Sequence, residues 1–287
     1  MEDLNRSAIG IVGTGLIGTS LALALKDRDA KQNILGCDTN ETHVREAMER
    51  GAFDGFKEDP LALAKHCDIL VVATPISAVR SIFEYIKSVA ERIVITDVGS
   101  VKSSTIIDAC SVWGKMPTRM VPAHPIAGTE NSGPVAASKD LFASHYVFIT
   151  PEQKTDQVAV NTVRDLWRKV GAKIEILTPA QHDELFAATS HLPHIVAYAL
   201  INSLEQAGVN TGFSAGGLKD FTRIAASNPM MWRDIFIANE TYLLDSIKTF
   251  EKSVRTIRKL IEKKHGDGLL NFLEKTVAEK KNLNLKD

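Results

Sequence analysis

Short apolar runs alternate with helix-length segments through the first half of the chain. Residues 8–12 predict a buried strand, and comparable runs predict further strands at 34–37, 69–73 and 93–96. Weaker patterns indicate strands at 120–121, 146–149 and 172–177. Strands separated by helix-length crossovers favour a parallel sheet with right-handed connections. The pattern therefore predicts an α/β fold with a doubly wound, mostly parallel sheet.

The pattern changes at Thr178 and Pro179. Threonine is a favoured N-cap and proline a favoured first helical residue, so these two residues predict the start of a long helix. Beyond it the apolar residues recur at three- and four-residue steps, and no strand is predicted. We expect an α/β domain over residues 1–177 and an all-helical domain over 178–287.

The composition indicates a protein without a nucleic-acid or membrane partner. The 287 residues carry a formal net charge of −1, whereas nucleic-acid-binding proteins usually have a clear basic excess. No run approaches the roughly 18 apolar residues of a membrane helix, and the first strand begins too early to leave room for a signal peptide. The three cysteines are scattered, so we expect them to be reduced and to bind no metal. We therefore expect a soluble, cytoplasmic protein.

The segment 13–18 has the spacing Gly-x-Gly-x-x-Gly, and its members are Gly13, Thr14, Gly15, Leu16, Ile17 and Gly18. It follows a predicted strand and precedes a predicted helix, which is the context of a Rossmann-like dinucleotide site. The first glycine permits a tight turn, the second lets the backbone approach a pyrophosphate, and the third lets helix and strand pack closely. The helix N-terminus then offers N–H donors to the phosphates. The alternative is a glycine turn that only packs a helix on a strand.

Asp38 follows the second predicted strand, twenty residues after the last of these glycines. A carboxylate there accepts hydrogen bonds from ribose hydroxyls and repels a 2′-phosphate, so NAD is favoured over NADP. Thr74 and Pro75 follow the third main strand, and Ser100 follows the fourth. Because the carboxyl ends of parallel strands meet at the ligand-binding edge of such sheets, we expect these residues beside the cofactor. The alternative role for Ser100 is to cap the next helix.

The segment His-Pro-Ile-Ala-Gly-Thr-Glu at 124–130 predicts a stiff loop that presents a histidine. Pro122 and Pro125 fix φ on either side of His124, and the glycine permits a turn. Histidine exchanges protons near neutral pH, which makes His124 a candidate general base. A surface or structural histidine is the competing interpretation.

Two segments of the helical half carry further candidate chemistry. His191 and His194 lie three residues apart and so share a helix face. They could form a metal pair, but no acidic or cysteine partner has metal-site spacing, so buried hydrogen-bonded histidines are the alternative. Arg223 belongs to a polar segment that ends at Trp232, and its planar fork suits carboxylate recognition. An ion pair between Arg223 and Asp220 is the competing interpretation.

Five ordered segments together resemble the prephenate dehydrogenase family, which includes the arogenate and cyclohexadienyl dehydrogenases. They are the glycine segment at 13–18, DVGSVK at 97–102, HPIAGTE at 124–130, SHLPH at 190–194 and GGLKDFTR with a following tryptophan at 216–232. The resemblance implies NAD-dependent oxidative decarboxylation of prephenate to 4-hydroxyphenylpyruvate, in tyrosine biosynthesis. It also implies a homodimer formed through the helical, substrate-binding domain, with tyrosine as a candidate feedback inhibitor.

The resemblance assigns roles to individual residues. His124 would take the proton of the substrate's ring hydroxyl, and Ser100 would orient that hydroxyl or the histidine. His194 and Arg223 would bind carboxylate groups of the substrate. The other residues implied to line the substrate pocket are Thr129, Glu130, His191 and Trp232.

Three other functions are weighed against this one. An arogenate dehydrogenase would make tyrosine directly from a substrate that carries an amino group in place of the keto group. A β-hydroxyacid dehydrogenase or imine reductase on the same fold would be expected to carry a catalytic lysine or another polar motif in place of the segment 124–130. A non-catalytic NAD-sensing or scaffold protein should have lost His124, Ser100 or Arg223, and all three are present. No fused chorismate mutase or regulatory domain is expected.

Overall fold

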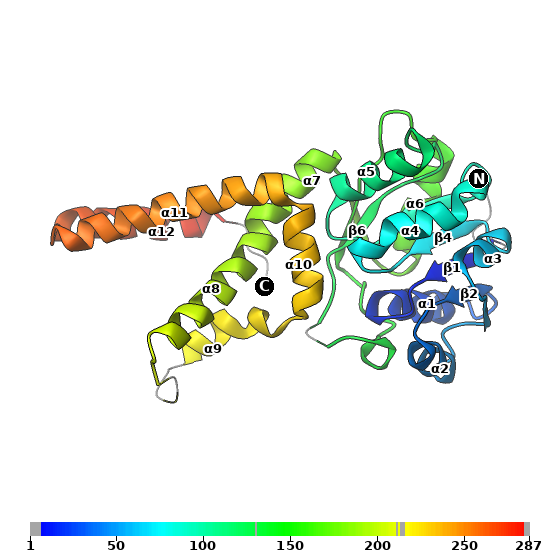
Figure 1. The fold of residues 1–287 in the computed structure, drawn as a ribbon, viewed down its shortest axis with the longest axis horizontal. Helices are drawn as coiled ribbons and strands as arrows, with labels where there is room; N and C mark the ends of the chain where they lie inside the picture. Colours follow the sequence, from blue (N-terminus) through cyan, green and yellow to red (C-terminus); the bar gives the residue numbers. More distant parts are fainter. Residues whose placement is uncertain (1–6, 130, 211, 213–215, 284–287) are drawn as a thin grey trace. The chain divides into compact units, whose positions relative to one another are not determined.

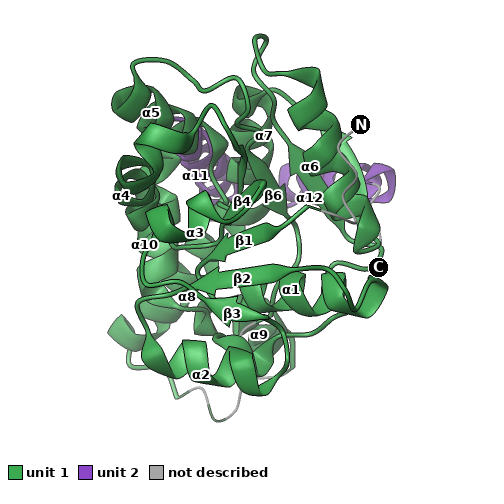
Figure 2. Cartoon of the chain, turned by 90° about the vertical axis from the view of Figure 1, so that its right-hand side faces the viewer, with its two compact units in different colours: residues 1–240 green, residues 241–287 purple. Residues whose placement is uncertain are grey.

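The computed structural model describes residues 7–129, 131–210, 212 and 216–283. The chain forms two compact units, residues 1–240 and residues 241–287, which are coloured separately in Figure 2. The first unit contains both sheets and the helices up to residue 238.

The main sheet has five parallel strands in the order β3-β2-β1-β4-β5. The strands are β1 (Ile9–Val12), β2 (Ile34–Cys37), β3 (Gly55–Phe56), β4 (Ile69–Val72) and β5 (Val94–Asp97). Four of them coincide with the main predicted strands to within a residue. β3 was not predicted, because two residues are too short to show an alternating pattern. The doubly wound, parallel α/β fold is confirmed.

Helices cover both faces of this sheet (Figures 1 and 2). One face packs against α1 (Leu16–Arg28) and α6 (Gln157–Lys169), and the other against α3 (Pro60–Lys65), α4 (Ile76–Ile86) and α5 (Lys102–Trp113). Side chains alternate between the two cores: Ile69 and Val71 of β4 enter the first, and Leu70 and Val72 the second. A strand buried on both faces therefore appears in the sequence as a continuous apolar run. The remaining helices of this part are α2 (Glu41–Glu49) and the 3-10 turns Lys87–Val89 and Pro134–Ala136.

A second, three-stranded sheet consists of β6 (Ala123–Pro125), β7 (Tyr146–Ile149) and β8 (Lys173–Ile176). β6 is antiparallel to β7, and β7 is parallel to β8. The prediction of a loop over 124–130 is therefore wrong for His124 and Pro125, because backbone pairing with β7 holds residues 123–125 as a strand. The strand predicted at 120–121 is reduced to an isolated bridge between Met120 and Ile95.

The described residues after 178 form helices and no strand, as predicted. They are α7 (Pro179–Phe186), a π-helical turn (Ala187–His191), α8 (Leu192–Gln206), α9 (Gly216–Thr222), a 3-10 helix (Arg223–Ala226), α10 (Pro229–Ala238), α11 (Glu240–Glu262) and α12 (Gly266–Asn282). Thr178 caps α7 in a reciprocal arrangement with Gln181. The domain boundary at 177 stays a prediction, since α7 packs against α5 within the first compact unit.

The predicted single long helix after Thr178 is interrupted. A π-helical turn ends at His191, two residues before Pro193. Proline has no N–H to donate to the carbonyl four residues earlier, so the regular ladder cannot continue through this point. The turn changes the direction of the side chains of the SHLPH segment relative to α7.

Candidate active site

The glycine segment joins β1 to α1 in the arrangement that the sequence predicts. Gly13 has φ of +94°, and a Cβ on it would lie 2.4 Å from the carbonyl oxygen of Ala73. A Cβ on Gly18 would lie 2.0 Å from the carbonyl oxygen of Gly13. Neither position accepts a side chain, because both backbones are in close contact with a neighbouring strand or turn.

Gly15 differs from the other two glycines, because nothing lies within 4 Å of the Cβ position that a side chain would take. It is the N-cap of α1, and no side chain caps this helix end. The N–H groups at the start of α1, including those of Leu16 and Ile17, therefore have no partner within the helix. Open space beside uncapped N–H donors fits the pyrophosphate of a dinucleotide.

Asp38 lies at the carboxyl end of β2, and its carboxylate is fixed beside the glycine segment. One oxygen accepts hydrogen bonds from the backbone N–H of Thr14 at 2.6 Å and from its hydroxyl at 2.9 Å. The other oxygen accepts from the N–H of Asn40 at 2.8 Å. The carboxylate is thus held where the adenosine ribose of a bound dinucleotide lies in this fold.

Thr74 and Pro75 follow β4 directly, and Pro75 is the N-cap of α4. The backbone of residues 73 and 74 contacts Gly13, as the short distances from its Cβ position show. Ser100 follows β5, in the loop before α5. In the described part of the chain no hydrogen bond joins Ser100 to His124, and the N-cap of α5 is Val101.

His124 projects from β6 on the opposite side from its buried neighbours Ala123 and Pro125, and it is half-buried. Its ring Nδ1 lies 2.9 Å from Nε2 of His182, and its ring edge packs against Phe186 with centroids 5.1 Å apart. Within the described residues the other ring nitrogen, Nε2, makes no hydrogen bond. His124 therefore has one nitrogen held by the protein and one that could accept a hydrogen from a ligand.

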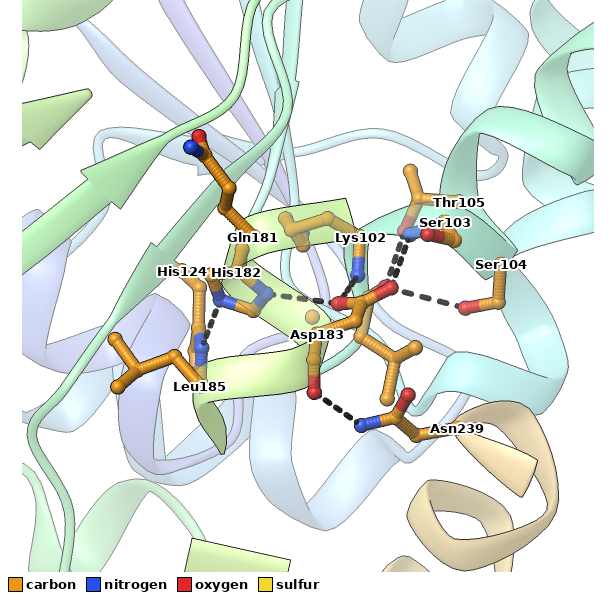
Figure 3. A network of polar contacts seen from close by, with 12 residues as sticks. Lys102, Ser103, Ser104, Thr105, His124, Gln181, His182, Asp183, Leu185 and Asn239 are labelled. Carbon is orange, nitrogen blue, oxygen red and sulfur yellow. Dashed lines mark hydrogen bonds and ion pairs between the residues drawn. The ribbon is translucent and has the colours of Figure 1, made fainter. Parts of the chain in front are cut away.

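The partner of His124 is itself part of a chain of buried contacts that the sequence did not indicate (Figure 3). Nδ1 of His182 lies 2.8 Å from a carboxylate oxygen of Asp183. That carboxylate also accepts from the backbone N–H groups of Lys102 and Ser103, each at 2.8 Å. Asp183, from α7, thus caps the first turn of α5, which has no side-chain cap of its own.

A buried ion pair fixes the backbone next to His124. Nζ of Lys102 lies 2.5 Å from a carboxylate oxygen of Asp97, and neither side chain is exposed to solvent. Nζ also donates to the carbonyl oxygen of Ala123 at 2.6 Å, and Asp97 accepts from the N–H of Ala123 at 3.2 Å. The pair therefore joins the end of β5, the start of α5 and the strand that carries His124.

The surroundings of His124 keep it uncharged. Burial lowers the pKa of His124 well below its ordinary value, and the nearby His182 and Lys102 lower it further. Burial also lowers the pKa of His182, against the opposing effect of the hydrogen bond to Asp183. A neutral imidazole is the form that can accept a proton.

His191 is buried, and its Nδ1 lies 3.0 Å from the side-chain nitrogen of Asn239, an amide that also donates to the carbonyl oxygen of Asp183 at 2.8 Å. His194 stacks on Trp232 with ring centroids 3.5 Å apart. His191 also touches Trp232, at 6.1 Å between centroids, so the two histidines share a face as predicted. In the described ranges no group of three or more His, Cys, Asp or Glu could hold a metal ion.

Trp232 packs within the chain against Val101, next to Ser100, and against Ile235. Its Nε1 is buried and has no hydrogen-bond partner among the residues that the structure describes. Arg223 is exposed, and its positive charge helps lower the pKa of His194, after the larger effect of burial. The described residues provide Arg223 with no ion pair, so the suggested pair with Asp220 is absent.

The two remaining predicted residues follow β6. Thr129 is exposed, and its hydroxyl donates to the carbonyl oxygen of Asn131 at 3.2 Å. Glu130 lies outside the described residues. No helix of the described chain is both long and apolar enough to cross a membrane.

No sequence pattern points to His182 and Asp183 beyond the capping pattern that begins α7. Lys102 and Asp97 stood inside the quoted DVGSVK segment, but nothing in the pattern showed that they pair. An acidic residue at a strand end, five residues before a lysine that begins the next helix, could have suggested it.

Comparison with known families decides the relationship. A family model described as "Prephenate dehydrogenase, nucleotide-binding domain" matches residues 21–176, and one described as "Prephenate dehydrogenase, dimerization domain" matches residues 178–275. The chain belongs to the prephenate dehydrogenase family. The resemblance inferred from the five segments is thus confirmed, and the chain is an oxidoreductase of this family with a nucleotide-binding domain and a place in tyrosine biosynthesis.

Three relatives illustrate the similarity. The chain is 32% identical to the prephenate dehydrogenase of Bacillus subtilis, over 94% of this chain and 74% of that protein. It is also 32% identical to the cyclohexadienyl dehydrogenase of Zymomonas mobilis, over 93% of each chain. The crystal structure of prephenate dehydrogenase from A. aeolicus, in complex with hydroxyphenyl propionate and NAD+, superposes with a TM-score of 0.89 at 32% identity, covering 99% of this chain and 100% of that one.

Proposed function

We propose that this protein catalyses the NAD-dependent oxidative decarboxylation of prephenate to 4-hydroxyphenylpyruvate. The observation that carries the proposal is His124: a neutral histidine beside the ligand-binding edge of the sheet, held by one ring nitrogen with the other left for a substrate. Its strand is tied to the end of β5 through Ala123 and Asp97. The A. aeolicus relative, with NAD+ and an aromatic acid bound, supports the same chemistry.

The dinucleotide fits the residues present. The open face of Gly15 and the uncapped start of α1 would receive the pyrophosphate, and the Asp38 carboxylate would accept from the adenosine ribose. A 2′-phosphate would place negative charge against that carboxylate, which favours NAD over NADP. When bound, the nicotinamide supplies the acceptor for the hydride.

The chain's own contribution is proton transfer and orientation. Nε2 of His124 would accept the proton of the ring hydroxyl as the O–H bond breaks and the carbinol carbon becomes a carbonyl carbon. Loss of the ring carboxylate as carbon dioxide then leaves the bonding electron pair to make the aromatic phenolate, which becomes the phenol by taking the proton back from His124. Much of the driving force therefore comes from the substrate. Ser100, in the loop after β5, would orient the hydroxyl or the histidine. A positioned base of this kind contributes about 10² to 10⁴ in rate.

The substrate is a dianion and needs cationic or hydrogen-bonding partners. His194 and the exposed Arg223 are the carboxylate-binding candidates, with His191, Trp232, Thr129 and Glu130 around them. We assign Arg223 to the side-chain carboxylate, because a tight grip on the ring carboxylate would oppose its loss. The homodimer remains part of this proposal, and the match to a dimerization domain supports it.

The test is the reduction of NAD by purified protein offered prephenate and arogenate in parallel, each with NAD and with NADP. We expect turnover of prephenate with NAD. Preference for arogenate would keep the mechanism and replace the substrate, as the cyclohexadienyl and prephenate relatives at equal identity illustrate. NAD binding without any turnover would support a non-catalytic NAD-sensing role instead.

A further inference from the structure

We propose that His182 and Asp183 are positioning residues that fix the tautomer of His124, so that Nδ1 carries the hydrogen and Nε2 is the base. The inference deepens the proposed function and rests on it for the role of His124. The tautomer itself is inferred from the hydrogen-bond geometry of His124, His182 and Asp183. The three side chains form a continuous line from β6 through α7 to the first turn of α5 (Figure 3).

The positions of the hydrogens on the two histidines follow from the protonation state of Asp183. The Asp183 carboxylate receives the backbone N–H groups of Lys102 and Ser103, and it is fully buried at a helix N-terminus. Burial opposes ionisation, but the hydrogen bonds from His182, Ser103 and Lys102 outweigh it and hold the pKa of Asp183 below its ordinary value. Asp183 is therefore a carboxylate, and a carboxylate only accepts hydrogen bonds.

The next step fixes His182. Its Nδ1 faces the carboxylate at 2.8 Å and must carry a hydrogen, because two acceptors at that distance would repel. A neutral imidazole has one N–H, so Nε2 of His182 is an acceptor. Since that nitrogen lies 2.9 Å from Nδ1 of His124, the hydrogen between the rings belongs to His124. The lone pair of His124 is then on Nε2, the nitrogen that has no partner within the described chain.

The same line stabilises the charge that forms during turnover. When Nε2 takes the substrate proton, His124 becomes an imidazolium whose Nδ1–H already points at His182. His182 in turn is bonded to the Asp183 carboxylate, so the positive charge is offset through a preformed path with no reorganisation. No proton has to leave His124 along this path for the step to balance.

Substitution of His182 gives the first test. His182→Gln keeps both a carbonyl acceptor for His124 and an N–H₂ donor for Asp183, whereas His182→Met fills similar volume and keeps neither. We expect His182→Met to lower kcat by on the order of 10- to 100-fold with KM and NAD affinity unchanged, and His182→Gln to recover most of the loss. Equal losses in both variants would show that the ring only fills space.

A spectroscopic measurement separates this inference from the proposed function. The ¹⁵N chemical shifts of imidazole nitrogens distinguish protonated from unprotonated sites, and His124→Asn identifies the signals of His124. We expect Nδ1 protonated and Nε2 unprotonated in the wild-type protein, with the preference lost in His182→Met. An Nε2-protonated His124 in the wild type would overturn the inference even if prephenate is turned over. The expected tautomer in a protein without turnover would sink only the proposed function.

Asp183→Asn supplies a second variant that preserves an oxygen to cap α5. The groups that face His124 are then Lys102 of α5, His182 of α7 and His191 of the π-helical turn, all of which lower its pKa. The other nearby carboxylate, Asp97, is paired with Lys102. Without the charge of Asp183, protonated His124 is therefore less stable. The pH below which kcat/KM falls should therefore move to lower values. An unchanged pH profile alongside normal folding would contradict a link between Asp183 and His124.

Discussion

Two regions of the first compact unit differ in how completely their polar groups are paired. Around His124, the side chains of Asp97, Lys102, His182 and Asp183 are buried, and each has partners within 3.2 Å. We call this set the His124 network. The second region, which we call the anion segment, consists of His194, Arg223 and Trp232. There the guanidinium is exposed, and the indole N–H is buried without a partner in the described chain.

The difference indicates that one region has its polar groups arranged before a ligand binds, whereas the other has polar groups available to a ligand. The polar groups of the His124 network are paired without a ligand, so the proposed proton transfer would need little rearrangement of these side chains. In the anion segment a cation and a donor have no partner among the described residues, and such polar groups gain most when a charged ligand binds them. Under the proposed function, the first region would carry out the chemistry and the second would bind the substrate.

The largest expected effect tests the chemical half of the comparison. His124→Asn should lower kcat by about 10² to 10⁴, because amide groups cannot accept the hydroxyl proton at neutral pH. Steady-state kinetics and NAD titration measure turnover and cofactor affinity separately, and affinity should be kept. His145→Asn, at an exposed histidine, is the matched control. Near-normal turnover of His124→Asn would remove it from the role of base.

Lys102→Met tests how much the buried Lys102–Asp97 ion pair of the His124 network contributes to the stability of the fold. Removing one partner of a buried ion pair leaves Asp97 uncompensated, which typically costs about 3–5 kcal/mol of folding free energy. Urea denaturation measures the loss, and the double variant Lys102→Met with Asp97→Asn should recover part of it. Lys139→Met, which breaks the exposed pair with Asp27, should change the free energy of unfolding far less. Equal effects at Lys102 and Lys139 would contradict the structural role.

Arg223→Ala tests the affinity half. A hydrogen bond to a charged group contributes about 1.5–3 kcal/mol, so KM for the substrate should rise by roughly 10- to 100-fold with a smaller change in kcat. Lys219→Ala removes a neighbouring exposed charge of α9 and should leave KM near its original value. If KM is unchanged in Arg223→Ala, another cation binds the carboxylate.

The sequence predicts the glycine segment and Asp38 better than the His124 network, for a physical reason. The glycine segment and Asp38 act through backbone turns and strand ends that local patterns encode, and the structure places them together. The bond between His124 and His182 joins residues 58 positions apart, and no local pattern specifies it. The strand at 123–125 was missed for a similar reason, because its prolines suggest a loop while pairing with β7 overrides that local preference.

The π-helical turn is a second example of what local sequence patterns do not specify. Pro193 correctly marks a break in the hydrogen-bond ladder, but the local pattern does not say whether the chain kinks, ends or widens there. His191, at the end of the widened turn, has tertiary contacts with Asn239 and Trp232 that no local pattern specifies. Local rules thus locate the irregularity, and packing decides its form.

The smallest expected effect is a pH dependence of the free energy of unfolding that comes from His191. It distinguishes this structural histidine from the proposed catalytic one. Burial lowers the pKa of His191 to about 4, against the opposing charge of Asp183, whereas an unfolded chain titrates near 6.5. Between these two pH values the unfolded state binds more protons than the folded state. The free energy of unfolding is therefore highest, as far as this group contributes, above about pH 6.5. It falls as the pH drops towards 4, by at most about 1.4 kcal/mol per pH unit for one group.

Urea unfolding at several pH values measures that slope. His191→Gln keeps an acceptor for Asn239 and removes the titration, so it should flatten the acidic slope while leaving the stability near neutral pH similar. His145→Gln, at an exposed ring, should leave the slope unchanged. A slope that persists in His191→Gln would place the acid sensitivity in His124 and His182, and the His124 network would then lose stability and activity over the same pH range. That coincidence would remove the distinction between structural and catalytic histidines, because protonation of the His124 network would govern both the stability of the fold and the proposed base.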